Sequence, residues 1–155
     1  MNRKLTNLLC DELKERLAYF LTRYHKVHNS YGRAAICLDK REIVCFSWVE
    51  MYHQEADLYK VWKETGVWDY NNLNLKKKWD ANITYYDMNF LSAATLFLQM
   101  PIKKALYNDN YIIQIFAILD RRIGKRTLRK IKENKAYQNY PSWVKQFYDL
   151  RLEMY

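Results

Sequence analysis

The sequence has little of what flexible linkers, disulfide frameworks or membrane segments require. Its 155 residues include three glycines, two prolines and three cysteines, and the cysteines show no Cys-x-x-Cys spacing. An odd, small number of cysteines is typical of buried thiols in a reducing compartment. No apolar stretch approaches the roughly 20 residues that a membrane-spanning helix needs, and the N-terminus lacks the apolar core of a secretory signal. We therefore expect one cytoplasmic domain over residues 1–155.

Motifs of the common catalytic classes are also missing. The three glycines stand 34 and 58 positions apart, which excludes a glycine-rich phosphate loop, and no Gly-x-Ser-x-Gly elbow is present. His25 and His28, with His53 or Glu42, are the combination that would suit a metal-dependent hydrolase. His-x-x-His spacing outside a helix is a weak signal. We therefore expect no catalytic site, no metal and no cofactor.

Hydrophobic periodicity predicts an α+β fold, with an N-terminal three-stranded antiparallel meander packed against a helical C-terminal part. Alternating apolar residues place the meander at about residues 16–48, with a short polar link between its last two strands. A capping box at Ser47–Glu50 and a C-cap at Gly66 delimit the next helix. Helices are predicted over residues 4–15, 49–65, 87–100, 110–134 and 141–154, with a bend at Gly124 and the longest loop at 67–82.

Positive charge is concentrated in one segment. The net charge is +9, and residues 121–135 contain eight basic side chains and one acidic side chain. A face of this kind attracts nucleic acid, acidic protein or anionic lipid. It can also be a solvated face on which Arg122 or Arg126 pairs with a carboxylate such as Asp120. No aromatic residue lies within 121–135, so base stacking inside the segment is not expected.

Five short motifs occur together in this chain. They are TRYxxxH at residues 22–28, GR at 32–33, the hairpin link at 39–42, DRRxGKRxL at 120–128 and WxxxFYxLRxE at 143–153. This set resembles a family of small, uncharacterised bacterial proteins over most of the chain except residues 55–85. The family has no established catalytic activity, and its members are reported near polymorphic-toxin and Rhs-type genes. The resemblance therefore implies an immunity role against a toxin domain.

Together these features predict a non-catalytic module that binds another protein, with an acidic protein surface or a toxin domain as partner. A nucleic-acid-binding protein that uses residues 121–135 is the alternative, and a hydrolase is a weaker one. Aromatic residues and lysines around the predicted loop are the candidate partner-binding residues: Tyr52, Tyr59, Trp68, Tyr70, Lys76, Lys77, Lys78 and Trp79.

The polar residues of the motifs are assigned to the scaffold: Arg23, His28, Arg33, Asp120, Arg121, Arg122, Lys125 and Arg126. Arg23 falls in the predicted sheet and Arg122 near the C-terminal helices. We expect Asp39 or Asp120 to bridge these two arginines and so lock the two halves of the molecule together, since guanidinium groups suit bidentate pairing with carboxylates.

Overall fold

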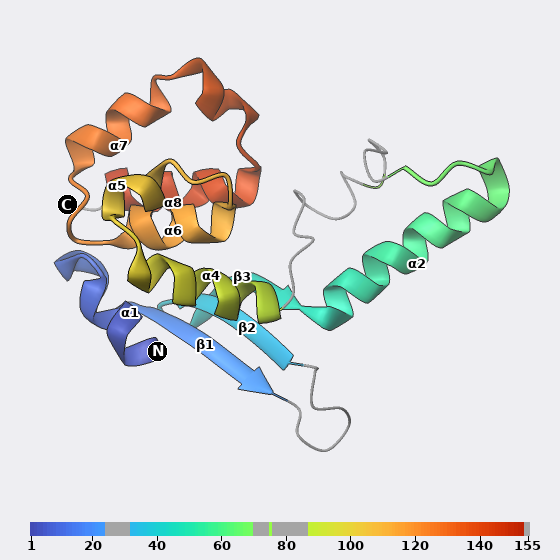
Figure 1. Cartoon of the computed structure of the whole chain (residues 1–155), viewed down its shortest axis with the longest axis horizontal. Coiled ribbons are helices and arrows are strands. Elements are labelled where there is room, and N and C mark those ends of the chain that lie inside the picture. The colour runs from blue at the N-terminus through green and yellow to red at the C-terminus, as the bar shows by residue number, and fades with distance from the viewer. Residues whose placement is uncertain (24–31, 70–74, 76–86, 154–155) are drawn as a thin grey trace.

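A computed structural model describes residues 1–23, 32–69, 75 and 87–153, with the backbone alone at 23, 47–55, 87 and 88. Strands β1 (Leu17–Arg23), β2 (Gly32–Leu38) and β3 (Arg41–Ser47) form one antiparallel sheet in the order β1-β2-β3. The α+β prediction and the N-terminal meander are therefore confirmed (Figure 1). The helices are α1 (Asn2–Leu8), α2 (Trp48–Thr65), α4 (Asp87–Gln99), α5 (Ile102–Leu106), α6 (Tyr111–Leu119), α7 (Lys125–Lys132) and α8 (Ser142–Glu153), with 3₁₀ turns at Asp11–Leu13 and Lys135–Asn139.

The hairpin between β2 and β3 turns on two residues. Asp39 and Lys40 both have positive φ, 49° and 67°, which is the conformation that a tight type I′ turn requires. Asp39 is well suited to it, because a short polar side chain tolerates the left-handed region. Its backbone N–H also donates to the carbonyl of Arg16, 2.8 Å away, and its carboxylate pairs with the Arg16 side chain. The turn is thus tied to the start of β1.

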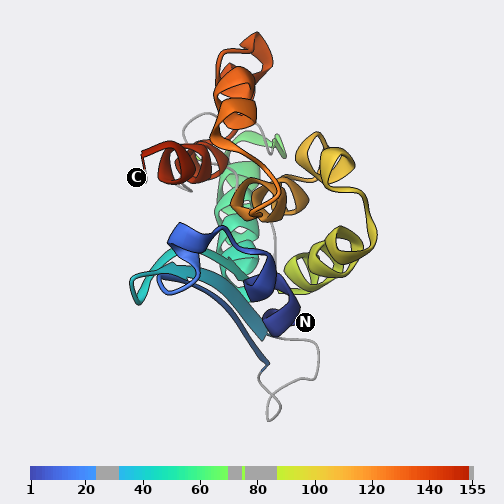
Figure 2. The same ribbon diagram turned by 90° about the vertical axis from the view of Figure 1, so that its left-hand side faces the viewer.

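Helix α6 forms the centre of the hydrophobic core. Asn110 caps its N-terminus by accepting from the backbone N–H groups of Ile112 and Ile113, and every residue from Ile112 to Leu119 is buried. Figure 2 shows α6 surrounded by α4, α5 and α8, with α1 and the sheet below. The buried helix predicted over Tyr111–Leu119 is therefore confirmed, and its all-round apolar surface is what such a position demands.

Aromatic rings fill the space between the sheet and the helices. The Phe90 ring of α4 lies 5.5 Å from Phe46 of β3 and 5.3 Å from Phe116 of α6, measured between ring centroids. Tyr19 of β1 meets Phe116 edge-on at 5.6 Å. Tilted and edge-on rings at these distances are favourable pairs. They join the sheet to α4 and α6 in one continuous core.

The helix predicted over residues 4–15 is interrupted. Helix α1 ends at Leu8, and Leu9 is extended, forming an isolated antiparallel bridge with Asp120. The N–H of Cys10 donates to the carbonyl of Leu119 at 3.0 Å, and the N–H of Arg121 donates to the carbonyl of Leu8 at 2.8 Å. The apolar spacing of this segment suits a helix equally well, so only these long-range hydrogen bonds decide the extended conformation.

The helix predicted over residues 110–134 is also divided. Helix α6 stops at Leu119, and α7 starts after Gly124, which is its N-cap. Between them, Asp120 is extended because its segment pairs with Leu9. Helix α5 was not predicted. Pro101 ends α4 as expected, but it also serves as the N-cap of α5, and its carbonyl accepts from the N–H of Ala105 at 3.1 Å.

A buried arginine fixes the chain between α6 and α7. Arg151 of α8 is 4% exposed, and it donates from Nε to the carbonyl of Ile118 at 2.8 Å and from Nη2 to that of Ile123 at 2.6 Å. Glu12 lies 4.0 Å from Nη1. One guanidinium fork therefore satisfies backbone carbonyls on both sides of the α6–α7 connection.

Replacing Arg151 should destabilise the fold strongly. Arg151→Ala leaves the carbonyls of Ile118 and Ile123 without their donors in the core, and we expect a loss of about 3 kcal/mol in the free energy of unfolding. Arg151→Lys should recover only part of this, because an ammonium group lacks the fork. Urea denaturation measures both, with Lys130→Ala, an exposed residue, as the control. A loss below about 0.5 kcal/mol for Arg151→Ala would contradict the assigned role.

Tyr148 is fully buried in α8, with its ring 5.1 Å from Tyr137 and 6.2 Å from Tyr140. Its hydroxyl has no hydrogen-bond partner among the residues that the structure describes. Burial raises the pKa of Tyr148 above its usual value of 10.0. Because the raised pKa favours the neutral phenol in the folded state, this stabilisation is present below pH 10 and is lost as the pH rises further.

We therefore expect Tyr148→Phe to keep or slightly increase stability at neutral pH, since it removes an unpaired buried hydroxyl. Above about pH 10 the variant should lose less stability than the wild type, because one raised tyrosine pKa is gone. Unfolding free energies measured from neutral to alkaline pH test both points. A large loss at pH 7 would show that the hydroxyl has a partner after all.

Candidate functional site

Helix α2 extends away from the rest of the molecule, as Figure 1 shows. Leu58 is buried, whereas Tyr59, Lys60 and every residue from Trp62 to Asp69 are exposed, and Val61 is half-buried. Gly66 ends the helix with a φ of 73°, as its predicted C-cap position requires. The last two turns of α2 therefore present side chains to solvent on most of their circumference.

Four of these exposed side chains are large and apolar. Tyr59 is 47% exposed, Trp62 44%, Val67 58% and Trp68 44%. We call these four residues the α2 patch. The Tyr59 and Trp62 rings lie 5.7 Å apart between centroids, and the ammonium group of Lys63 sits 5.4 Å from the centre of the Tyr59 ring. Ring stacking and a cation–π contact restrain these aromatic side chains at an otherwise open surface.

The structure describes the side chains of only some of the predicted partner-binding residues. Tyr59 and Trp68 belong to the α2 patch. Tyr52 belongs to α2, but its side chain is not described. Tyr70, Lys76–Lys78 and Trp79 lie outside the described residues. The sequence analysis missed Trp62 and Val67. The spacing of Trp62 three residues after Tyr59 would have placed the two rings on one helix face.

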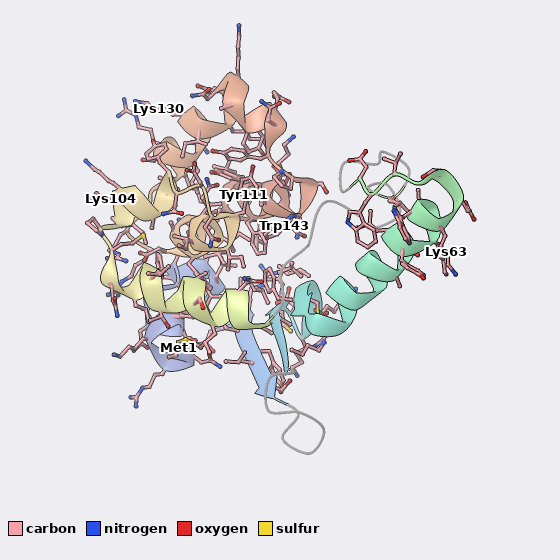
Figure 3. All side chains as sticks on the ribbon, turned by 45° about the vertical axis from the view of Figure 1, so that its right-hand side comes forward. Met1, Lys63, Lys104, Tyr111, Lys130 and Trp143 are labelled. Carbon is pink, nitrogen blue, oxygen red and sulfur yellow. The ribbon has the colours of Figure 1, made fainter. Side chains whose placement is uncertain are left out.

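A second surface gathers cations at the other end of the molecule. Lys103 and Lys104 of α5 and Arg126, Arg129 and Lys130 of α7 are all exposed. We call these five residues the cationic pole. Figure 3 labels Lys104 and Lys130, which extend to the same side of the molecule, while Lys63 of α2 lies on the opposite side. Leu128 and Ile131 are buried on the inner face of α7, as predicted, and they orient its cations outward.

The structure does not test the metal hypothesis, because it describes none of the three histidine side chains. His25 and His28 lie outside the described residues, and the side chain of His53 is not described. Glu42 forms an ion pair with Arg33. Among the residues that are described, no group of three or more histidine, cysteine, aspartate or glutamate side chains is placed to hold a metal ion. Within the same residues, no helix combines the length and the apolar character needed to cross a membrane.

Comparison with protein families gives one match. The model of the SF0329 protein family matches residues 1–152, nearly the whole chain. The chain belongs to this family. No curated protein and no solved structure matches the chain significantly.

In this SF0329 family member, the motif residue Arg33 lies on the sheet face opposite the helices. Its partner in β3 is Ser47, and Glu42 pairs with Cys37, four residues further along β2. Residues two apart on a strand share a face, so Arg33, Ala35 and Cys37 lie on the same face of β2. Glu42 is opposite Cys37, and its ion pair with Arg33 therefore crosses Ala35, which is 1% exposed. Arg33 thus covers the second face of a sheet whose first face carries the core. Arg23 lies in β1 with its side chain undescribed, and His28 lies outside the description.

Asp120 and Arg122 form a local ion pair. The carboxylate of Asp120 is completely buried and accepts from Nε of Arg122 at 2.9 Å, from Nη2 at 2.6 Å and from its backbone N–H at 2.8 Å. This pairing raises the pKa of the Arg122 guanidinium. Asp120 also follows the C-terminal end of α6, where the helix dipole disfavours negative charge. Arg122 compensates for that unfavourable position.

The expected bridge is observed at one end, because Asp120 binds Arg122, whereas the side chain of Arg23 at its other end is not described. Asp120 binds an arginine two residues away, and Asp39 pairs with Arg16 of its own half. The N-terminal segment and the C-terminal helices are joined by the backbone hydrogen bonds of Cys10 and Arg121. Arg121 is exposed as a side chain, so its structural contribution here is its N–H. Backbone N–H and C=O groups can pair whatever side chains the residues carry, so the sequence did not indicate this connection.

The Asp120–Arg122 pair gives a direct test of the scaffold assignment. Arg122→Ala removes two of the three donors to a buried carboxylate, and we expect a loss of about 1–3 kcal/mol in the free energy of unfolding. Arg126→Ala is the matched control from the same motif, because its side chain is exposed and should cost under about 0.5 kcal/mol. Equal midpoints for the two variants in urea denaturation would reject the assignment.

Proposed function

We propose that this protein is a non-catalytic module that binds another protein through the α2 patch. The observation that supports the proposal most is the exposure of Tyr59, Trp62, Val67 and Trp68 together on one projecting element. Tyrosine and tryptophan are the residues that most often dominate binding energy at protein interfaces. Isolated exposed apolar residues need no explanation, but several large ones clustered on one helix end point to an interaction site.

The geometry of the patch suits recognition of a protein groove. Projection from the body allows a partner to surround the end of α2, and the restrained rings of Tyr59 and Trp62 lose little conformational entropy on binding. The neighbouring charges are mixed, since Lys60 and Lys63 stand beside Glu64 and Asp69. Charge at the patch therefore does not select an acidic partner, and apolar contact with the rings supplies the binding energy.

An immunity role is the finer form of this proposal. The resemblance of the motifs to proteins reported near polymorphic-toxin and Rhs-type genes supports a toxin domain as the partner. A protein of this kind needs a rigid scaffold and a binding surface, and it requires no reaction centre. The fold supplies the first through its continuous core and the second through the α2 patch.

The patch can be tested by substitution of its central ring. Trp62→Ala should weaken the complex by about 2 kcal/mol or more, roughly 30-fold in Kd. The tagged full-length chain is purified from native cells with nuclease present, the protein that co-purifies is identified, and its Kd for both variants is measured by calorimetry. Tyr107→Ala, which removes an exposed ring outside the patch, is the matched control and should bind normally.

Two outcomes would reject the proposal. One is the absence of any stoichiometric protein partner once nucleic acid has been digested. The other is a partner that binds wild-type protein and Trp62→Ala with equal affinity. If the captured partner is a toxin domain, its co-expression with this protein should restore growth, and co-expression with Trp62→Ala should not.

A further inference from the structure

The cationic pole has a chemistry different from that of the α2 patch. We propose that it is a nucleic-acid-binding site, at which the cations of α7 contact phosphates and the ring of Tyr107 stacks on an unpaired base. This inference does not depend on the protein-binding proposal, because the two surfaces lie on opposite sides of the molecule and share no residue (Figure 3).

The cations of α7 that face outward are not neutralised. Arg126, Arg129 and Lys130 form no ion pair with any residue that the structure describes. Two nearby carboxylates are already engaged, since Asp120 binds Arg122 and Asp149 binds Lys132 at 2.5 Å. These pairs engage two of the nearby acids, and Glu133, at the C-cap of α7, is the one acid within residues 121–135. The outward-facing cations of the helix therefore outnumber the acids beside them and can attract an anion.

The spacing of these cations suits a line of phosphates. Arg126 is three residues before Arg129 and four before Lys130 on one helix, so it neighbours both at about 5–6 Å between Cβ atoms. The opposite face holds Leu128 and Ile131, both buried, which prevents the helix from turning its cations away. A polyanion that follows α7 would therefore meet several cations at once.

Helix α5 adds a stacking ring to this charged surface. Tyr107, directly after α5, is 64% exposed, and it lines an open hollow of about 530 Å³ with Lys103, Lys104, Asn108 and Asp109. The lining therefore carries two ammonium groups and one carboxylate, and its net charge is positive. An exposed ring next to lysines is the arrangement with which proteins hold single-stranded nucleic acid, through base stacking and phosphate contact together.

The composition of the pole favours nucleic acid over an acidic protein. Among the described residues of α7 and its flanking turns, no large apolar side chain is exposed. A protein interface normally requires such anchors at its centre, whereas binding to a phosphate backbone requires mainly cations. The exposed aromatic residue of this region is Tyr107, and its flat ring suits a base.

Fluorescence anisotropy with labelled single-stranded RNA of random sequence tests the proposal over a range of salt concentrations. The triple variant Arg126→Ala/Arg129→Ala/Lys130→Ala should reduce the slope of log K against log salt by about 2, which is about 0.7 for each lost phosphate contact on a single strand. Its affinity at low salt should fall more than about tenfold. These residues are exposed, so thermal unfolding should remain unchanged and show that the variant is folded.

Matched variants separate the two parts of the site. Lys60→Ala/Lys63→Ala removes cations from α2 and should leave RNA binding unchanged. Tyr107→Ala should weaken RNA binding about fivefold or more without changing the salt slope, because it removes a stacking ring and no charge. Trp62→Ala should bind RNA normally, so failure of the protein-binding proposal and failure of this one are distinguishable.

Three results would overturn the inference. They are no RNA binding even at low salt, an unchanged salt slope for the triple variant, and competition by polyglutamate as effective as that by unlabelled RNA of equal charge. The last result would assign the pole to an acidic protein surface. Unchanged affinity of Tyr107→Ala would overturn the stacking contact.

Discussion

The burial of α6 on every side is the constraint around which the molecule is built. A helix composed almost entirely of isoleucine, leucine, phenylalanine and alanine gains about 1.5–3 kcal/mol for each large side chain removed from water. No single neighbour can cover such a helix. The sheet with α4, the short helix α5 and the C-terminal helix α8 each cover part of it, so elements from both halves of the sequence pack on the same helix.

The polar segment between α6 and α7 is held in place by several hydrogen bonds and an ion pair. Its backbone bonds to the N-terminal segment, its carbonyls accept from Arg151, and its one buried carboxylate is matched by Arg122. Every one of these contacts fixes the point at which α7 leaves the core. These contacts fix where α7 begins, and the burial of Leu128 and Ile131 turns its cations outward. In the basic motif, Asp120 and Arg122 stabilise the fold, whereas Arg126 contributes charge to the surface.

The two candidate surfaces differ in the physical basis of binding. The α2 patch offers restrained rings with mixed charges around them, which suits a partner that removes apolar area from water. The cationic pole offers charge with one exposed ring, which suits a partner whose binding releases counterions. The two surfaces share no residue, so the two proposed partners would not compete for the same side chains.

Local patterns in the sequence determined much of this architecture. Alternation placed the three strands, and the short polar segment at residues 39–42 marked the link between the last two. Asn110 and Gly66 marked helix ends, and the strongly apolar segment Tyr111–Leu119 predicted a buried helix. Each of these signals acts between residues close together in the chain. Sequence reasoning also named Tyr59 and Trp68 among the candidate partner-binding residues, and both side chains are exposed.

Tertiary structure alone decided the remaining features. Leu9 and Asp120 are extended because their backbones pair across 111 positions, and side-chain patterns carry no record of such pairing. Whether an aromatic residue is core or surface depends on what packs against it: Tyr148 is enclosed, whereas Tyr107 and Trp62 are open. In the same way, charge counts revealed the basic segment, but the folded positions of Asp120 and Asp149 decide that Arg122 and Lys132 form ion pairs.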